Sequence, residues 1–205
     1  MAEYLEEKGY PQKDSAEQKG GNVMVKKILS IIFFVLVIIA FPKNIQAYNV
    51  QIADIGAYQF HQNILYDNEG INKWLNENIS IDNHIDMVGS DSVYDRYAFN
   101  MRDNNLKGVK EAFATIGLSV NKAGFVSRIL VLGARNTTGA KCIGYACKRV
   151  VLTLGMNTDE WISIYSQSPG NDDMSVWCEK LNRRIHLKRT VYNGLLACEL
   201  YATNK

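Results

Sequence analysis

The stretch RRIHLKRTVYNGLLACELYAT, residues 183–203, decides the fold of this chain. Its Asn193-Gly194 dipeptide stands between two runs in which apolar and polar residues alternate. Such a dipeptide suits a two-residue type I′ turn, because both positions of that turn need a positive φ. The stretch therefore predicts a β-hairpin in which Tyr192 lies opposite Leu195.

This register divides the hairpin into two faces, since successive side chains of a strand point to opposite sides. The face expected to join the core holds Ile185, Leu187, Val191, Leu196, Cys198, Leu200 and Ala202. The other face is basic and aromatic, and its candidate binding residues are Arg184, His186, Lys188, Tyr192 and Tyr201. Arg189 is the one charged residue on the core face, and it is expected either to reach the strand edge or to meet an acid.

Weaker patterns upstream predict the remaining elements. Four more strands are predicted: from alternation over residues 93–101, from a run over 125–132 that is apolar nearly throughout, and from two runs at 150–154 and 161–165 around a turn. Helices are predicted over residues 104–116, ended by Gly117, around Trp74, and over residues 175–181. The expected class is α+β, mainly antiparallel sheet with two or three short helices, a C-terminal β-hairpin and disulfide bonds.

Residues 24–47 have the pattern of a signal peptide. Lys26 and Lys27 precede a largely apolar run over residues 28–41, and a polar segment ends at Ala47, where we expect cleavage. A retained anchor is the alternative, but a spanning helix needs about 20 apolar residues, and this run is shorter. We therefore expect a secreted or cell-envelope protein that meets a membrane only through its leader.

Residues 1–23 carry five acids and three lysines, the wrong sign for the start of a leader. Lys19-Gly20-Gly21 can be encoded by a purine run that pairs with bacterial ribosomal RNA. This predicts a translated ribosome-binding site, a true start at Met24 and a bacterial source, with a genuine cytoplasmic extension as the alternative. Residues 48–205 are then a single exported domain, long enough for one core.

All four cysteines lie in the predicted exported part: Cys142, Cys147, Cys178 and Cys198. An even number of thiols in an oxidising compartment predicts two disulfides. Three pairings are open; we prefer 142–147 with 178–198, the second closing a loop of about 20 residues. Half of a metal site is one alternative for the first two cysteines, but a matching second half-site is missing. A cysteine nucleophile with His84 or His186 is another, which export disfavours.

The sequence holds one further metal candidate. Asp82, His84 and Asp86 stand at every second position of DNHID, so on a strand all three would share a face. A solvated loop produces the same letters, and no metal or other cofactor is predicted. Gly-rich phosphate loops and the common hydrolase motifs do not occur in the sequence.

The charge distribution bears on the partner. The net charge is +2, but residues 48–104 hold nine acids and three bases, whereas residues 105–205 hold seven acids and fourteen bases. The basic hairpin face resembles a nucleic-acid surface, yet an exported protein rarely meets nucleic acid, and a basic edge that prevents sheet aggregation explains the same residues. An unknown protein or an anionic envelope polymer is the expected partner. Whether the chain is an enzyme stays open: a non-enzymatic binding module is predicted, and a small secreted hydrolase with an acidic or His/Asp site is the alternative.

Overall fold

The computed structural model describes residues 50–66, 78–106 and 112–204. The chain divides into two compact units, residues 1–35 and 36–205, and all described residues belong to the second. The predicted upstream extension, the leader and the helix around Trp74 lie outside the described residues. Within the described ranges, no helix is both long and apolar enough to cross a membrane.

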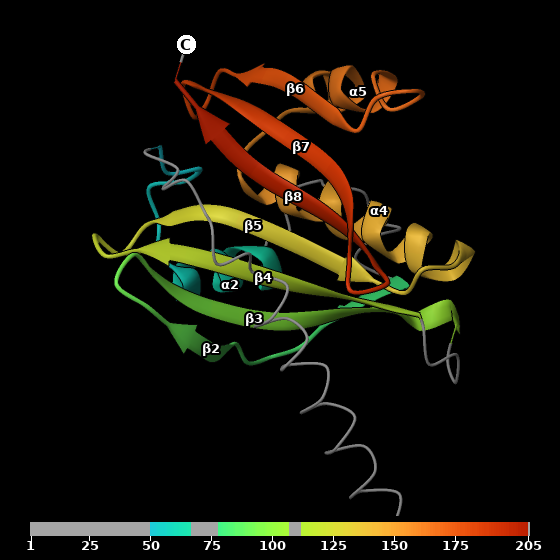
Figure 1. The fold of residues 1–205 in the computed structure, drawn as a ribbon, viewed down its shortest axis with the longest axis horizontal. Coiled ribbons are helices and arrows are strands. Elements are labelled where there is room, and N and C mark those ends of the chain that lie inside the picture. Colours follow the sequence, from blue (N-terminus) through green and yellow to red (C-terminus); the bar gives the residue numbers. More distant parts are fainter. Residues whose placement is uncertain (1–49, 67–77, 107–111, 205) are drawn as a thin grey trace, which may run out of the picture. The chain divides into compact units, whose positions relative to one another are not determined.

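The strands of the described part form one antiparallel sheet (Figure 1). They are β1 (Ile79–Ile81), β2 (Asp86–Ser90), β3 (Tyr94–Asp103), β4 (Phe113–Asn121), β5 (Val126–Gly133), β6 (Asp173–Cys178), β7 (Arg183–Tyr192) and β8 (Leu195–Thr203). Their order is β1-β3-β4-β5-β8-β7-β6, and β2 also pairs with β3. A 3-10 turn, η1 (Asn104–Leu106), follows β3. Together with the helices, this sheet confirms the predicted mainly antiparallel α+β class.

β7 and β8 form the predicted C-terminal hairpin. Tyr192 pairs with Leu195, and the register continues without a shift as far as Arg184 and Thr203. The turn residues Asn193 and Gly194 have φ values of 49° and 80°, as a type I′ turn requires. The strands predicted at residues 93–101 and 125–132 are confirmed as β3 and β5, and every residue of the central strand β5 is buried.

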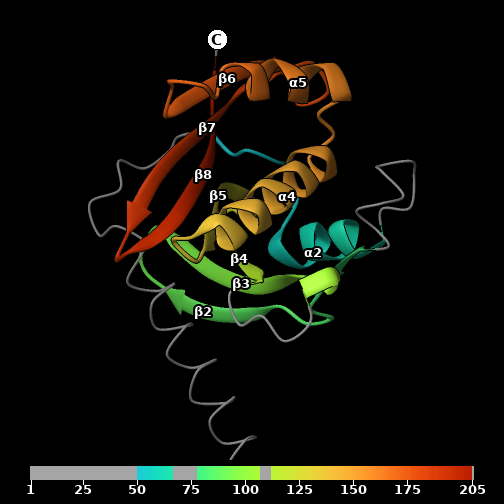
Figure 2. The same ribbon diagram turned by 90° about the vertical axis from the view of Figure 1, so that its right-hand side faces the viewer.

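Three α-helices accompany the sheet in the described ranges: α2 (Ala57–Tyr66), α4 (Thr137–Thr153) and α5 (Thr158–Ser166). Figure 2 shows α4 lying across one face of the sheet, with α2 beside it and α5 next to β6. The buried stripe of α4 includes Cys142, Ile143, Ala146, Cys147, Val150 and Val151. It joins inward side chains of the sheet, among them Ile116, Val131 and Leu200, in one hydrophobic core.

Residues 150–153 and 161–165 are helical, so the prediction of two strands around a turn is wrong. Asn136 caps α4, and its side chain accepts a hydrogen bond from the Gly139 N–H at 2.8 Å. Asn157 and Glu160 form a capping box that begins α5. Between the helices, Gly155 has a φ of 95°, which is typical of the residue that ends a helix. The apparent β-turn is therefore the end of one helix followed by the cap of the next.

Two predicted helices are wrong: the first begins with the 3-10 turn η1 and continues, where the structure describes it again, in a strand, and the second is a strand followed by a turn. Phe113 and Ile116 were assigned to a helix ended by Gly117, but all three belong to β4, which pairs with β3 on one side and β5 on the other. Residues 107–111 of that predicted helix lie outside the described residues. Within the predicted helix 175–181, β6 runs as far as Cys178. Pairing with neighbouring strands decides both cases, because it satisfies the backbone groups that a helix would satisfy internally.

The sheet also buries a charged pair on the face opposite the helices. Arg128 of β5 and Glu199 of β8 approach to 2.5 Å between Nε and Oε1, with side-chain exposures of 2% and 5%. Such a pair is stable only while both partners are present, because either charge alone would be costly to bury.

β6 forms one edge of the sheet, and a side chain bonds to it where a further strand would pair. The side-chain amide of Gln167 donates from Nε2 to the carbonyl oxygen of Ser175 at 2.9 Å. Its Oε1 accepts from the N–H of Ser175 at 3.1 Å. Gln167 is the C-cap residue of α5, so these bonds tie the end of that helix to the edge strand.

Candidate functional site

The five residues predicted to bind a partner lie on the outer face of the β7–β8 hairpin. His186 and Tyr201 are Cα partners, and their rings stack with centroids 4.7 Å apart and an interplanar angle of 7°. Arg184 and Lys188 stand on either side of His186 along β7, and both are exposed. Tyr192 lies at the turn end of the strand, beside Asn193. The structure thus groups four of the five residues and leaves Tyr192 at the end of the hairpin.

Carboxylate side chains of the neighbouring strands lie beside the basic and aromatic residues of this outer face. Asp173 of β6 accepts a hydrogen bond from the Tyr201 hydroxyl at 3.1 Å and lies 3.5 Å from Nδ1 of His186. Burial, and then the negative charge of Asp173, raises the pKa of Tyr201 to about 12. Lys188 pairs in register with Asp173 on one side and Glu199 on the other. The outer face carries charges of both signs, and its role in binding stays a prediction.

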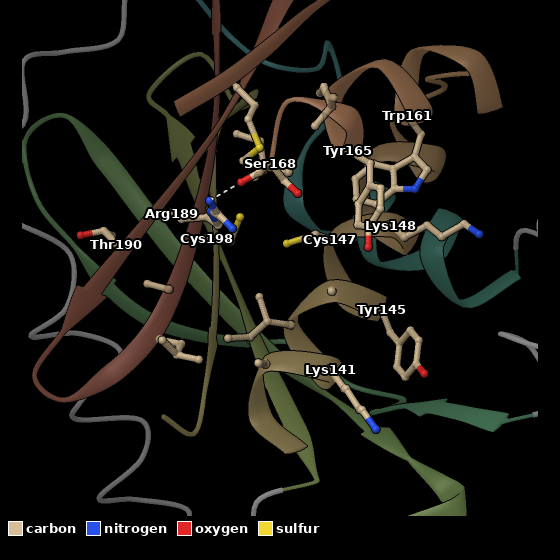
Figure 3. A pocket seen from close by; sticks show the side chains of 18 of the residues that line it. Lys141, Tyr145, Cys147, Lys148, Trp161, Tyr165, Ser168, Arg189, Thr190 and Cys198 are labelled. Carbon is tan, nitrogen blue, oxygen red and sulfur yellow. Dashed lines mark hydrogen bonds between the residues drawn. The ribbon is translucent and has the colours of Figure 1, made fainter. Parts of the chain in front are cut away.

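A cavity of about 680 Å³ lies on the inner side of the same hairpin, where β7 and β8 face α4 and α5 (Figure 3). Most of its wall is apolar or aromatic: Ala140, Ile143, Gly144, Trp161, Ile164, Met174, Leu187, Leu196 and Ala197. Trp161 and Tyr165 stand four residues apart on α5, with ring centroids separated by 6.1 Å. Toward the turn, the inner face of the hairpin leaves the core, since Val191 is 47% exposed.

Arg189, the charged residue on the inner face, contributes to the cavity wall. In Figure 3 its guanidinium points toward Ser168, and Nη2 donates to the carbonyl oxygens of Ser168, at 2.7 Å, and of Asn171. The same Nη2 lies 3.6 Å from the Asp172 carboxylate. Arg189 therefore reaches the loop that precedes the edge strand β6 and also meets an acid, so both sequence alternatives describe it in part. Nη1 and Nε make no hydrogen bond with the described residues and are available to a ligand.

The remaining polar groups of the cavity wall are two more cations and several hydroxyl groups: Thr137, Lys141, Tyr145, Lys148, Tyr165, Ser168 and Thr190. The described residues that line the cavity include neither a carboxylate nor a histidine. Ligand sites typically combine an apolar wall with a few convergent polar groups. This wall is complementary to a molecule with an apolar body and an anionic end.

All four cysteines are buried with free thiols, so the structure does not support the predicted disulfides. The preferred pairing is also geometrically wrong. Cys142 and Cys147 stand five residues apart on one helix, a rise of about 7.5 Å, and disulfides need a Cα separation below about 7 Å. Cys178 and Cys198 lie on β6 and β8 with β7 between them, which separates their strands by about 10 Å.

The three histidines lie outside the cavity wall. His61 is buried in α2, with Nε2 2.8 Å from the carbonyl oxygen of Asp82. Asp82 follows the end of β1, whereas Asp86 begins β2, so residues 82–86 are not one strand and do not share a face. His84 is exposed and lies 3.5 Å from Asp86. Among the described residues, no cluster of three His, Cys, Asp or Glu side chains is placed to hold a metal ion.

Comparison of the chain with protein-family models, with curated proteins and with solved structures finds no match. The fold and the cavity together define an α+β protein with an apolar pocket that carries cations in its wall.

Proposed function

We propose that this chain is a non-enzymatic binding module of the cell envelope or extracellular space, and that its ligand is a small amphipathic anion held in the cavity between α4, α5 and the β7–β8 hairpin. The observation that carries the proposal is the placement of Arg189 in a wall that is mostly apolar or aromatic and holds no carboxylate among its described residues. Its guanidinium supplies the charge, and the surrounding aliphatic and aromatic side chains supply the surface that an apolar ligand body buries.

The size of the cavity supports a small molecule as ligand. Small-molecule sites typically enclose about 300–1,000 Å³, and this cavity of about 680 Å³ lies within that range. The polar groups stand at separate places, with Arg189 on the hairpin and the lysines on α4. A ligand with an anionic group and an apolar body matches these cations and the mostly apolar wall better than a bare ion or a sugar would.

The charges of the wall set the sign of the ligand. The wall holds Arg189, Lys141 and Lys148, and the described lining holds no carboxylate. A cationic ligand would meet repulsion at every charged group of the wall, whereas an anionic one is attracted by each. Nη1 and Nε of Arg189 can each donate a charge-assisted hydrogen bond to a carboxylate or phosphate oxygen, and such bonds are stronger than those between neutral groups.

The hydrolase alternative requires a cleft lined by acids or by a histidine, since those groups carry general acid–base catalysis. The observed cavity wall has neither among its described residues, and this favours binding over hydrolysis. Capture of a protein or an anionic envelope polymer on the outer face of the hairpin is a second candidate function. The exposure of Arg184 and Lys188 on that face favours it.

A titration with three probes of equal chain length tests the proposed ligand class. Dodecanoate, dodecanol and dodecyltrimethylammonium, each below its micelle concentration, are added to the full chain while tryptophan fluorescence is recorded. We expect saturable binding of dodecanoate. The affinity for each of the other two probes should be at least about tenfold lower, because one charge-assisted hydrogen bond contributes about 1.5–3 kcal/mol. The signal should disappear in Trp161→Phe, since Trp161 lines the cavity.

Arg189→Met removes the guanidinium and keeps an apolar stem, and Lys188→Met is its matched control, because Lys188 precedes it on β7 and points to the outer face. We expect Arg189→Met to weaken dodecanoate binding by about 10–100-fold and Lys188→Met to leave it unchanged. Equal affinity for all three probes, or equal losses in the two variants, would refute the proposal.

A further inference from the structure

Cys147 and Cys198 face each other across the junction of α4 and β8. Their sulfur atoms are 3.5 Å apart, and both side chains belong to the wall of the cavity (Figure 3). Cys147 lies on the buried stripe of α4. Cys198 lies in the middle of β8, with Val131 of β5 and Arg189 of β7 as its Cα partners. Two central elements of the fold therefore present thiols to each other at one point.

The other cysteines are not in a position to compete for either thiol. Cys142 cannot bond to Cys147 within one helix, for the reason given above. Cys178 pairs in register with Arg183, whereas Cys198 pairs with Arg189, six residues farther along β7. At about 3.3 Å per residue, this offset alone separates Cys178 from Cys198 by about 20 Å along the strands.

We propose that Cys147 and Cys198 form a redox-active dithiol, and that its oxidation to a disulfide joins α4 to β8 in the cavity wall. A disulfide bond is about 2.05 Å long, so the sulfur atoms have to approach by about 1.5 Å. Side-chain rotation and a small shift of α4 supply a movement of this size. The proposal is independent of which ligand the cavity holds, since it concerns only the two sulfurs and the elements that carry them.

The oxidant is an external disulfide, such as glutathione disulfide or the active-site disulfide of a thiol oxidoreductase. The thiolate of one cysteine attacks a sulfur of that disulfide and forms a mixed disulfide, while one thiol of the oxidant leaves. The thiolate of the second cysteine then attacks the protein sulfur of the mixed disulfide and releases the other thiol. The chain loses two protons and two electrons, and the external disulfide gains both as two thiols.

Access and ionisation set the rate of this exchange. Both sulfurs line the cavity, but each cysteine is only 3% exposed, so a local opening of the cavity wall has to precede attack on a small external disulfide. The neighbouring Cys198 thiol and burial raise the pKa of Cys147 well above the usual value, so little thiolate is present at neutral pH. Oxidation should therefore be slow near pH 7 and become faster as the pH rises, because the thiolate is the attacking species.

Peptide mapping of the full chain without reduction tests the pairing. After incubation with glutathione disulfide and alkylation of the remaining thiols, trypsin cuts after Lys141, Lys148 and Arg189. The proposal predicts that peptide 142–148 is linked to peptide 190–205 and that the pair is two hydrogens lighter than its parts. Peptide 142–148 contains both Cys142 and Cys147, so the same map of Cys142→Ser distinguishes them: the link should persist.

The link should be lost in Cys147→Ser and in Cys198→Ser. If either of these variants does not fold, the maps of the unchanged chain and of Cys142→Ser still decide the matter. Four alkylated thiols after incubation with excess glutathione disulfide at pH 8.5, a link to peptide 150–180, or loss of the link in Cys142→Ser would each overturn the proposal.

Discussion

Two glycines of α4 are expected to respond with opposite signs to the same substitution. A Cβ at Gly139, in the first turn, would lie 2.1 Å from the carbonyl oxygen of Ala134 and 2.6 Å from its nitrogen. Both are backbone atoms, so rotation of a side chain cannot relieve the overlap. A Cβ at Gly144, farther along the same helix, would meet nothing within 4 Å. Gly144 is therefore the matched control.

The magnitudes follow from two opposing terms. Alanine favours a helix over glycine by about 1 kcal/mol, and this term is the same at both positions. At Gly139, an overlap that only backbone movement can relieve costs about 3 kcal/mol, the upper end of the usual range for overpacking. We expect Gly139→Ala to lower the free energy of unfolding by about 2 kcal/mol and Gly144→Ala to raise it by about 0.5–1 kcal/mol.

Equilibrium unfolding of the full chain in urea, followed by far-ultraviolet circular dichroism, measures both changes. The two variants should share the slope of the unchanged chain and differ from it in midpoint, in opposite directions. A Gly139→Ala protein as stable as the unchanged chain would refute the close approach of Ala134 to the first turn of α4. It would also put in doubt the β5–α4 connection that sets this helix against the sheet.

The remaining predictions concern charged groups. Glu199→Leu should lower the free energy of unfolding by about 3–5 kcal/mol, because it removes the carboxylate beside the buried Arg128 guanidinium. The double variant that also carries Arg128→Met should recover much of this loss. A double variant as unstable as Glu199→Leu would count against the pairing. The backbone N–H groups of Tyr94 and then Val93 lower the pKa of Asp91 from 3.8 to about 2. A carboxyl group with a lowered pKa stabilises the fold above its unfolded pKa and loses this effect as the pH falls toward 2. In thermal unfolding, Asp91→Asn should thus have a lower Tm than the unchanged chain at pH 6, and the difference should become much smaller as the pH falls to 2. A constant difference would contradict the assignment.

The parts of the fold that could be predicted from the sequence are those specified by neighbouring residues. Asn193 and Gly194 select a turn whose geometry sets the register of all residues from Arg184 to Thr203. The run of β5 is apolar except for Ser127 and Arg128, and such a run is typical of a strand that is buried on both faces. In both cases local pattern and tertiary environment favour the same structure.

The helices α4 and α5 were missed because their residues favour strands by composition alone. Val150 and Val151 are β-branched, a class that is enriched in strands, yet both belong to the buried stripe of α4. The N-cap residues Asn136 and Asn157 carried the correct signal. Packing against the sheet then overrides the weak intrinsic preference of the valines, as tertiary context commonly does.

The cavity could not be predicted because its wall combines α4, α5 and three strands of the sheet. Of the residues in its wall, only Arg189 was recognisable in the sequence, as a charged residue on the apolar side of an alternating strand. The Cys147–Cys198 approach was equally hidden, since spacing along a chain does not determine which thiols meet. Once Cys147 was known to lie on a helix, the preferred link to Cys142 would have been excluded.

The amide of Gln167 has a consequence for the behaviour of the protein at high concentration. An outermost strand with unpaired N–H and C=O groups invites another polypeptide to add to it, which is a common route to aggregation. At Ser175 both groups are already occupied by Gln167, so a second molecule approaching this rim finds no bonding partner at that position. A single glutamine at the end of a helix thus helps to keep neighbouring molecules from joining their sheets.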